Sequence, residues 1–489
     1  MIHRKGIILL LCFSVFVVLV VSGCYRIRSS NGGGEIKNIP SGRIINVSDI
    51  ALPEGYIIEA VATGLNYPTG IAFDDEGVPY VTESGYSYGE VWETPKLIKI
   101  QEDGTLETVA TGGKNGPWNG VAFSEGNFYI AEGGQMEGGK ILKIDREREV
   151  STLISDLPSF GDHHTNGPVV RDGYIYFGQG TATNSGIVGK DNKKYGWLDR
   201  FPDFHDIPCD DITLAGFNVT AENVLDESAG EATTGAFVAY GQSTRKGQVI
   251  KGALPCSGAV MRYPLSGGEL ELVAWGFRNP YGLAFSPLGN LYLTDNAYDN
   301  RGSRPVWGAG DVLWEVETGK WYGWPDFSAG KSIIEKSYDA PGEDDLQKVL
   351  ANYPGTPPEP AAVLGVHSSS NGFDFSKNTG FGHEGEAFVA QFGDMAPEVG
   401  KVLSPVGFKV VRIDVSTGVI SDFAVNKGKR NGPASWLKSG GLERPIAARF
   451  DPAGSALYIV DFGILKMSKN GSEPVKNTGV VWKITRKQK

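Results

Sequence analysis

Few residues in this sequence are of a type that commonly does chemistry, and most of them stand at the start of similar segments. Only six of the 489 residues are histidine, and the chain has no Gly-x-Ser-x-Gly nucleophile turn and no His-Glu-x-x-His metal motif. One segment begins at His163 and His164 and another at His367, while Arg278 and Arg444 begin two more. A neutral imidazole accepts protons near pH 7 and a guanidinium binds anions, so these residues are the first candidates for a site.

The segments that follow these residues are copies of one phrase. It reads Pro-x-Gly, an apolar residue, Ala-Phe, a polar turn with glycine, and a short stretch rich in tyrosine, valine and threonine. Each copy predicts a two-stranded hairpin, and short apolar stretches between the copies bring the expected number of strands to about four per copy. One such unit cannot bury its own core, so the copies must stack against one another. The six copies occupy residues 67–85, 117–134, 165–180, 279–297, 369–393 and 444–463.

A six-bladed β-propeller over residues 51–489 is the fold that these repeats predict. The 67 glycines and 27 prolines indicate a turn-dense, all-β chain, and long helical periodicity is nearly absent. In a propeller the chain enters each blade at the central channel, so the residues just before each innermost strand should meet around one axis. The residues that this argument brings together are His164, Arg278, Asn279, His367 and Arg444, with Asn115 before the second copy.

Residues 190–255 interrupt the third copy and are polar and rich in glycine and threonine. We expect a long insertion from the third blade that walls or caps the site, because long ordered loops in compact domains are usually functional. Cys209 lies within this part of the chain and Cys256 directly follows it. In an exported protein they most often form a disulfide, which would staple the ends of the insertion together.

The N-terminus predicts export and attachment to a membrane. A short basic start and an apolar run end in Val-Ser-Gly-Cys at Cys24, which resembles a bacterial lipobox. A plain transmembrane anchor is the alternative, but the apolar run is shorter than the roughly 20 residues that span a bilayer. We therefore expect a lipoprotein signal peptide at residues 1–24, lipidation of Cys24, a flexible tether at residues 25–50, and a location in the bacterial cell envelope.

The net charge of the chain bears on its partners. It is −11 at pH 7. General nucleic-acid binding usually needs a basic surface, so a nucleic-acid partner is not expected. The acidic balance indicates little else about the function.

The stretch at residues 276–285 reads Gly-Phe-Arg-Asn-Pro-Tyr-Gly-Leu-Ala-Phe and resembles the signature of the glucose/sorbosone dehydrogenase family, a group of quinoprotein β-propellers. Residues 164–180 are similar to the blade that carries the catalytic histidine of this family. The resemblance extends over about residues 50–487. The stretches that resemble the sorbosone dehydrogenase branch best are residues 322–325, 387–390 and 405–412.

This resemblance implies a sugar or aldose dehydrogenase that oxidises C1 of its substrate by hydride transfer to pyrroloquinoline quinone, assisted by Ca²⁺. Removal of the hydroxyl proton needs a base, and the resemblance assigns that role to His164. Electrons would then pass to an acceptor that the sequence does not identify. The other expected site residues are Arg278, Asn279, His367, Arg444 and Lys409 for the cofactor, Asn115 and His163 for the substrate, and the backbone carbonyls of Ala297 and Tyr298 for Ca²⁺.

Departures from the family pattern keep two other functions open. Tyr281 stands where the soluble glucose enzymes have glutamine, and Gly407 and Lys409 stand where those enzymes have paired arginines. One alternative is a non-catalytic propeller that binds carbohydrate or protein and has lost the quinone site. The other is a metal-dependent lactonase propeller, which needs acidic ligands in the channel. The carboxylates that end four of the copies, expected at a blade rim away from the axis, are Glu83, Glu132, Asp295 and Asp461.

Overall fold

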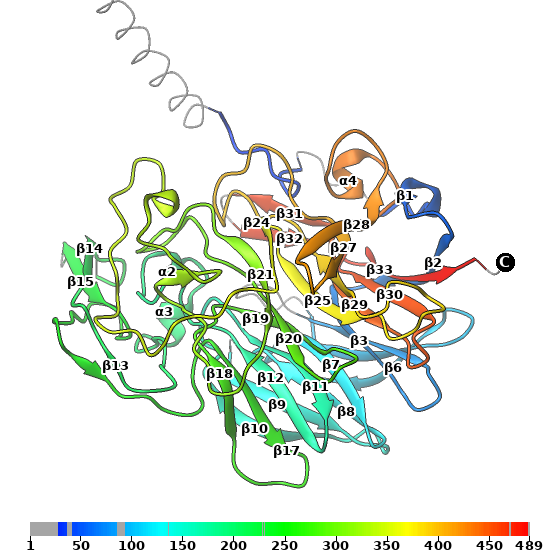
Figure 1. The fold of residues 1–489 in the computed structure, drawn as a ribbon, viewed down its shortest axis with the longest axis horizontal. Helices are drawn as coiled ribbons and strands as arrows, with labels where there is room; N and C mark the ends of the chain where they lie inside the picture. Colours follow the sequence, from blue (N-terminus) through cyan, green and yellow to red (C-terminus); the bar gives the residue numbers. More distant parts are fainter. Residues whose placement is uncertain are drawn as a thin grey trace, which may run out of the picture.

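The computed structural model describes residues 28–36, 42–85, 93–134, 136–226, 228, 230–468 and 471–487, and Figure 1 shows their arrangement. The predicted signal peptide at residues 1–24 and the predicted lipidation site Cys24 lie outside these residues. Within the described ranges, no helix is both long enough and apolar enough to cross a membrane.

Six antiparallel sheets, numbered here as blades 1 to 6 along the chain, confirm the predicted six-bladed β-propeller. Blade 1 contains β3 (Pro68–Phe73), β4 (Pro79–Glu83), β5 (Lys96–Ile100) and β6 (Leu106–Thr111), and blade 2 contains β7 (Trp118–Ser124), β8 (Asn127–Glu132), β9 (Gly139–Ile144) and β10 (Val150–Leu157). Blade 3 contains β11 (Thr165–Arg171), β12 (Tyr174–Gln179), β17 (Ala259–Pro264) and β18 (Glu271–Trp275), and blade 4 contains β19 (Pro280–Phe285), β20 (Leu291–Asp295), β21 (Gly310–Glu315) and β24 (Ala362–Val366). Blade 5 contains β25 (Ser370–Phe375), β26 (Ala387–Gln391), β27 (Lys409–Asp414), β28 (Val419–Asn426) and, at its outer edge, β1 (Ile50–Ala51). Blade 6 contains β29 (Pro445–Phe450), β30 (Ala456–Asp461), β33 (Gly479–Arg486) and β2 (Tyr56–Leu65).

Both ends of the propeller chain meet in blade 6. Its outermost strand β2 comes from the N-terminal side and pairs antiparallel with β33, the last strand of the chain. The innermost strands β3, β7, β11, β19, β25 and β29 follow one another around the channel, and β29 lies beside β3. The ring is therefore closed by hydrogen bonds between β2, from the N-terminal side, and β33, from the C-terminal end.

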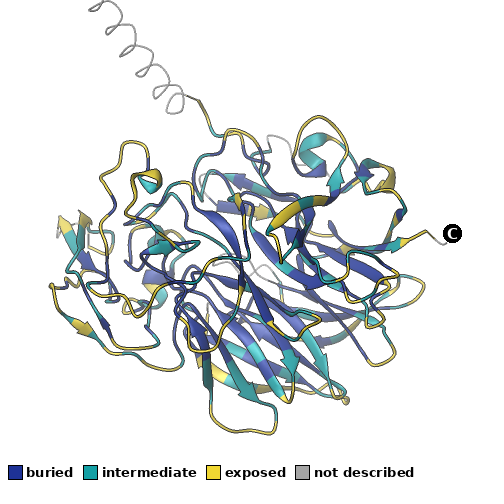
Figure 2. Ribbon diagram, in the orientation of Figure 1, coloured by how far each residue is buried: buried dark blue, intermediate teal, exposed yellow. Residues whose placement is uncertain are grey.

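The apolar core consists of one buried cluster between each pair of neighbouring blades. Between blades 3 and 4, for example, Val169 and Val260 pack with Leu283 and Trp314. Figure 2 shows the corresponding pattern, with buried sheets and exposed connecting turns. Because each cluster needs two blades, the stacking predicted from the repeats is what buries the core.

The glycine of the repeated phrase allows the innermost strands to lie close together. A Cβ added to Gly120 would lie 1.8 Å from the carbonyl oxygen of Gly167 in the next blade, and one added to Gly282 would lie 2.5 Å from that of Asn371. These distances are far below van der Waals contact, so no side chain fits there. The glycine of the phrase is therefore explained by packing between blades.

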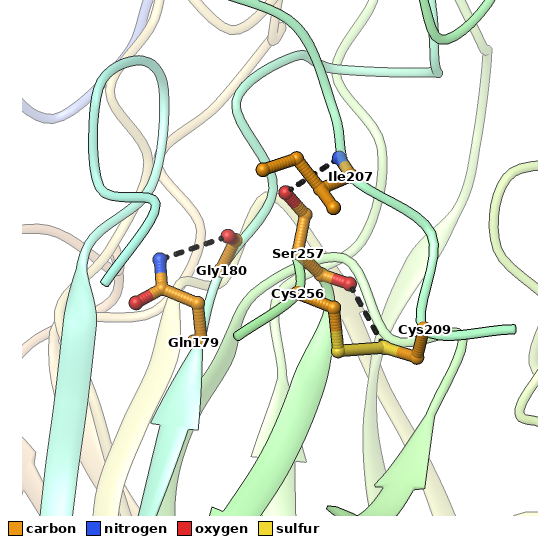
Figure 3. The surroundings of a disulfide bond; sticks show 6 residues. All are labelled: Gln179, Gly180, Ile207, Cys209, Cys256 and Ser257. Carbon is orange, nitrogen blue, oxygen red and sulfur yellow. Dashed lines mark hydrogen bonds between the residues drawn. A yellow bond between two sulfur atoms is a disulfide. The ribbon is translucent and has the colours of Figure 1, made fainter. Parts of the chain in front are cut away.

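The chain leaves blade 3 between the paired strands β12 and β17 and returns after residues 180–258 (Figure 1). The predicted disulfide Cys209–Cys256 is present in this excursion, with a sequence separation of 47 (Figure 3). Next to the disulfide, the Ser257 hydroxyl accepts from the Ile207 N–H at 3.1 Å, and the Ser257 carbonyl oxygen lies 3.7 Å from Cys209 Sγ. The elements of the excursion are α2 (Asp191–Lys194), α3 (Trp197–Arg200), β13 (Ile212–Thr213), β14 (Asn218–Glu222), β15 (Glu231–Gly235) and β16 (Val249–Ile250).

Other short elements connect or cover the blades. They are η1 (Val47–Asp49), β22 (Phe327–Ser328), β23 (Lys331–Ser332), η3 (Lys336–Tyr338), α4 (Ala434–Leu437), β31 (Leu465–Ser468) and β32 (Gly471–Pro474). The strands β31 and β32 form a small hairpin inserted between β30 and β33 of blade 6. This hairpin lies at the end of the channel that holds the cavity described below.

The residue that ends the second strand of a blade binds the segment that leads into the innermost strand. In blade 4, Asp295 Oδ1 accepts from the backbone N–H of Arg278 at 3.1 Å and of Asn279 at 2.7 Å. In blade 6, Asp461 accepts from the N–H groups of Glu443 at 2.9 Å and Arg444 at 2.8 Å. These carboxylates are buried.

Loss of the blade 6 carboxylate tests this structural role. Asp461→Ala leaves the N–H groups of Glu443 and Arg444 and the indole N–H of Trp482 without their acceptor, and Arg43 without its ion-pair partner. We expect the free energy of unfolding to fall by about 3–5 kcal/mol, because buried donors and a buried cation remain unpaired. Denaturant titration of the folded protein measures the change.

The matched control is Asp422→Ala. Asp422 binds Lys409 at 2.6 Å, but 58% of its side chain is exposed, so the pair contributes at most about 1 kcal/mol. Equal losses in the two variants would contradict the role assigned to Asp461.

Candidate functional site

A cavity lies on the propeller axis where the six innermost strands begin. Successive side chains of a strand point to opposite faces, and here the second residue of every innermost strand points into the channel. This residue is the x of the repeated Pro-x-Gly phrase, so the repeat itself marks the wall of the cavity. The six residues in this position, all of which line the cavity, are Thr69, Asn119, Asn166, Tyr281, Asn371 and Ile446.

One wall of the cavity is a continuous chain of hydrogen-bonded amides. Asn119 Nδ2 donates to Asn166 Oδ1 at 3.0 Å, and Asn166 Nδ2 donates to Asn279 Oδ1 at 2.9 Å. Asn279 Nδ2 donates to Asn296 Oδ1 at 2.9 Å. Asn296 Nδ2 then donates to the backbone carbonyl of Ser370, also at 2.9 Å. We call these four side chains the amide belt; it joins blades 2, 3 and 4 and ends on blade 5.

Asn371 extends this polar wall with an unused acceptor. Its side chain is buried and lines the cavity, and its Nδ2 donates to Ser369 Oγ at 3.4 Å. Its Oδ1 accepts no hydrogen bond from the part of the chain that the structure describes. A buried acceptor without a donor is unfavourable, so this atom suits a ligand that offers an O–H or N–H group.

The opposite wall is apolar and comes from blades 5 and 6. Phe392 and Met395 follow β26, Phe462 follows β30, and Leu465 begins β31. Ile446 completes this wall from β29. Among the described residues that line the cavity there is no lysine and no arginine. The cavity therefore combines an amide wall, an apolar wall and no positive charge.

His163 and His164 lie on the polar wall, as predicted for residues that open the third copy. His163 Nδ1 contacts the carbonyl and hydroxyl oxygens of Thr181, at 3.0 and 3.1 Å, in the segment that follows β12. Burial, and secondly the charge of Arg278, hold the pKa of His163 well below its ordinary value. Burial lowers the pKa of His164 to about 3. Both imidazoles are therefore neutral at pH 7.

Arg278 and His367 both contact the carboxylate of Asp299, which does not line the cavity. Arg278 Nη2 binds Asp299 Oδ2 at 2.7 Å and Asn184 Oδ1 at 3.0 Å, and its Nη1 donates to the Asn296 carbonyl at 3.2 Å. His367 Nδ1 lies 3.8 Å from the other oxygen of Asp299. Neither residue lines the cavity, whereas Asn279, next to Arg278, does. The convergence predicted for these residues is thus correct for His164 and Asn279 and is displaced for Arg278 and His367.

Three other predicted residues lie away from the cavity, and each has a clear reason. Arg444 is buried between the rings of Phe392 and Phe408, with its guanidinium carbon 4.8 and 5.0 Å from their centroids. Lys409 begins β27, the third strand of blade 5, and its ammonium group binds Asp422.

Asn115 is the third of these residues, and it has a structural contact. Its amide donates to Glu132 at 2.7 Å and to the Gly138 carbonyl at 3.0 Å. His164 and Asn279, directly before β11 and β19, do line the cavity. Asn115 and Arg444 do not, because Glu132 and Asp461, which end the second strands of their blades, bind them.

The predicted Ca²⁺ ligands lie in a separate small pocket. Ala297 and Tyr298 line it together with Trp314 and Trp324. Within the described residues no three His, Cys, Asp or Glu side chains are grouped as a metal would need. Glu83, Glu132, Asp295 and Asp461 are buried and do not line the cavity, so these four carboxylates are not placed as channel ligands.

The residues in place do not fit pyrroloquinoline quinone as the resemblance implied. The cofactor is a tricarboxylate, and buried carboxylates require cationic partners. No cation lines the cavity, the Arg278 guanidinium is bound to Asp299 and Asn184, and Lys409 lies on another strand. We therefore assign no reaction step to this cofactor.

Comparison with known proteins supports the fold. No family model and no curated protein matches the chain. Among solved structures, the holo pyranose dehydrogenase PQQ domain from Coprinopsis cinerea has a TM-score of 0.52 at 13% identity, covering 92% of this chain and 100% of that one. A family AA12 carbohydrate-active enzyme from Trichoderma reesei gives 0.51 at 15% identity, with coverage of 92% and 100%. The PQQ-bound aldose sugar dehydrogenase from Streptomyces coelicolor gives 0.50 at 14% identity, with coverage of 89% and 100%. The chain is therefore similar in fold to propellers of sugar dehydrogenases.

The depressed pKa of His164 predicts a specific pH dependence of stability. The unfolded chain binds a proton at His164 below its ordinary pKa of 6.5, whereas the folded protein does not until about pH 3. This group therefore lowers the free energy of unfolding as the pH falls through 6.5, by about 2 kcal/mol between pH 7 and pH 5. His164→Gln should remove that part of the pH dependence in urea titrations. The same loss between pH 7 and pH 5 in both proteins would contradict the buried neutral imidazole.

Proposed function

We propose that this protein is a sugar-binding propeller of the sugar-dehydrogenase type, and that a neutral carbohydrate binds in the channel cavity. The observation that carries this proposal is the pairing of the polar wall, with its unused Asn371 acceptor, and the apolar wall opposite. A sugar ring carries hydroxyl groups on its edge and C–H groups on its faces. Hydroxyl groups suit the amides, and the C–H faces suit side chains such as Phe392 and Leu465.

The charge of the cavity favours a neutral ligand over an anion. His163 and His164 are uncharged at pH 7, and no basic side chain lines the cavity among the residues described. Asp162, also in the lining, binds Arg301 at 2.6 Å, so its carboxylate has its own counter-charge. An anionic ligand would lose water without gaining an opposite charge, which is strongly unfavourable in a buried site.

Oxidation of the bound sugar at C1, as a quinone-dependent dehydrogenase, is the second candidate. The presence of His164 and Asn279 on the cavity wall favours it, as does the fold shared with dehydrogenases. Against it stands the pKa of His164, since a base of pKa about 3 accepts a proton poorly at pH 7. In the arrangement described, this imidazole is better suited to hold a sugar hydroxyl by a hydrogen bond.

Removal of the unused acceptor tests sugar binding. We expect Asn371→Ala to weaken the affinity for a neutral sugar about 5- to 10-fold, because one hydrogen bond of about 1 kcal/mol is lost. Calorimetric titration with glucose, galactose, xylose and maltose measures the affinity. The control is Asn127→Ala, since Asn127 begins β8, does not line the cavity, and donates from its side chain to the Glu125 carbonyl at 3.0 Å. No binding of any of these sugars to the unmodified protein would contradict the proposal.

Titration with pyrroloquinoline quinone separates the two candidates. Because the cavity offers no cation, we expect no saturable change in quinone absorbance, with or without Ca²⁺, and no dye reduction in the presence of an aldose. Saturable binding and aldose-dependent dye reduction that His164→Ala abolishes would favour the dehydrogenase instead. Sugar binding is measured independently, so the two results are interpreted separately.

A further inference from the structure

The segment that precedes the propeller is docked on the end of the molecule that holds the cavity. The N–H of Asn31 donates to the Val402 carbonyl at 2.9 Å, and the N–H of Gly33 donates to Asp394 Oδ2 at 3.3 Å. The N–H of Met467, in β31, donates to the Gly34 carbonyl at 2.7 Å. Figure 1 shows this segment beside β31 and β32. Residues 31–34 are called the docked segment below.

Three consecutive glycines make this docking possible. A Cβ added to Gly32 would lie 2.3 Å from Asp394 Oδ1, and one added to Gly33 would lie 2.4 Å from the ring of Phe408. A Cβ added to Gly34 would lie 2.4 Å from Met467 Cγ. All three glycines are buried, so the groove accepts a bare backbone and nothing larger. The position of the docked segment is therefore fixed by the sequence.

The docked segment lies next to the apolar wall of the cavity. Asp394, which binds Gly33, is adjacent in sequence to Met395, and Met467 shares β31 with Leu465. Met395 and Leu465 both line the cavity. The docked segment therefore lies at the cavity end of the propeller.

We propose that the lipid on Cys24 holds the cavity end of the propeller toward the membrane, so that this end faces a lipid surface. The inference goes beyond the proposed function, because it concerns the placement of the cavity and not its ligand; it rests on lipidation of Cys24. Even fully extended, the chain between Cys24 and Asn31 spans at most about 25 Å. The six residues of β19 alone add about 20 Å between the cavity end and the opposite end of the channel. The anchor therefore reaches the cavity end much more easily than the opposite end.

The side chains beside the docked segment suit a lipid surface. Leu403 directly follows Val402, whose carbonyl binds Asn31. The apolar residue Leu403 is 41% exposed. Arg28, just before the docked segment, is exposed and positively charged although the chain as a whole carries −11. Basic residues next to an anchor are attracted to anionic lipids.

Fluorescence quenching in vesicles tests the orientation. The mature lipoprotein is placed in vesicles of phosphatidylethanolamine and phosphatidylglycerol that include nitroxide-labelled lipid, with a bimane label at Leu403→Cys or at Leu288→Cys. Leu288 is 90% exposed and follows β19 at the opposite end of the channel. The remaining cysteines of the mature chain are the lipidated Cys24 and the Cys209–Cys256 disulfide, so labelling is specific.

We expect loss of fluorescence from the label at position 403 and little loss at position 288. Equal quenching at both positions, or stronger quenching at 288, would overturn the proposal. Cys24→Ser should abolish vesicle binding, and unchanged binding by that variant would also overturn it. None of these results depends on a sugar or on a quinone, so failure here is distinct from failure of the proposed function.

A glycine substitution tests the docked segment itself. Gly33→Leu places a side chain against Phe408 and should release the segment, so the difference in quenching between positions 403 and 288 should disappear. The control is Gly42→Leu, because an added Cβ at Gly42 meets nothing within 4 Å. Thermal unfolding confirms that both variants are folded. If Gly33→Leu is folded and the difference in quenching between positions 403 and 288 is unchanged, the role of the docked segment is refuted. If Gly33→Leu does not fold, the same comparison of positions 403 and 288 in the protein with Gly33 tests the orientation.

Discussion

The site depends on the hydrogen bonds between the carboxylate that ends the second strand of a blade and the segment that leads into the innermost strand. In blades 4 and 6 a buried aspartate at the end of the second strand accepts the N–H groups of the segment leading to the innermost strand. Blade 1 uses Glu83 in the same way, with the N–H of Asn66 at 2.7 Å. A buried N–H without an acceptor would be unfavourable by about 1–3 kcal/mol. In these three blades the segment is therefore fixed before any ligand is considered, and so is the direction in which the next side chain points.

This constraint also determines the charge of the cavity. When the backbone of residues 278 and 279 is held by Asp295, the Arg278 side chain is directed to Asp299 and the Asn279 side chain to the channel. In blade 6 the Arg444 guanidinium is likewise enclosed by aromatic rings. Neither of these guanidinium groups lines the cavity. A neutral wall of amides is what remains for a ligand.

The sequence was sufficient for the fold and for part of the site. The repeated phrase predicted six blades because its strands, turns and glycines are local features, and it predicted correctly that His163, His164 and Asn279 lie at the channel. The partners of Arg278 could not be predicted, since Asn184 and Asp299 come from a long excursion and a connecting loop with no repeat pattern. The position x of the phrase was not recognised as the lining of the cavity, although the alternation of side chains along a strand would have identified it.

The amide belt has a direction, and a single immobile atom sets it. The Ser370 carbonyl can only accept, so Asn296 must point its NH₂ group toward it and its oxygen toward Asn279. The same reasoning fixes Asn166 and then Asn119, one after another. An incoming molecule therefore meets a wall whose donors and acceptors are already oriented, and little rotational freedom remains to be lost on association. Discrimination between molecules that differ only in the placement of one hydroxyl group is a natural property of such a wall.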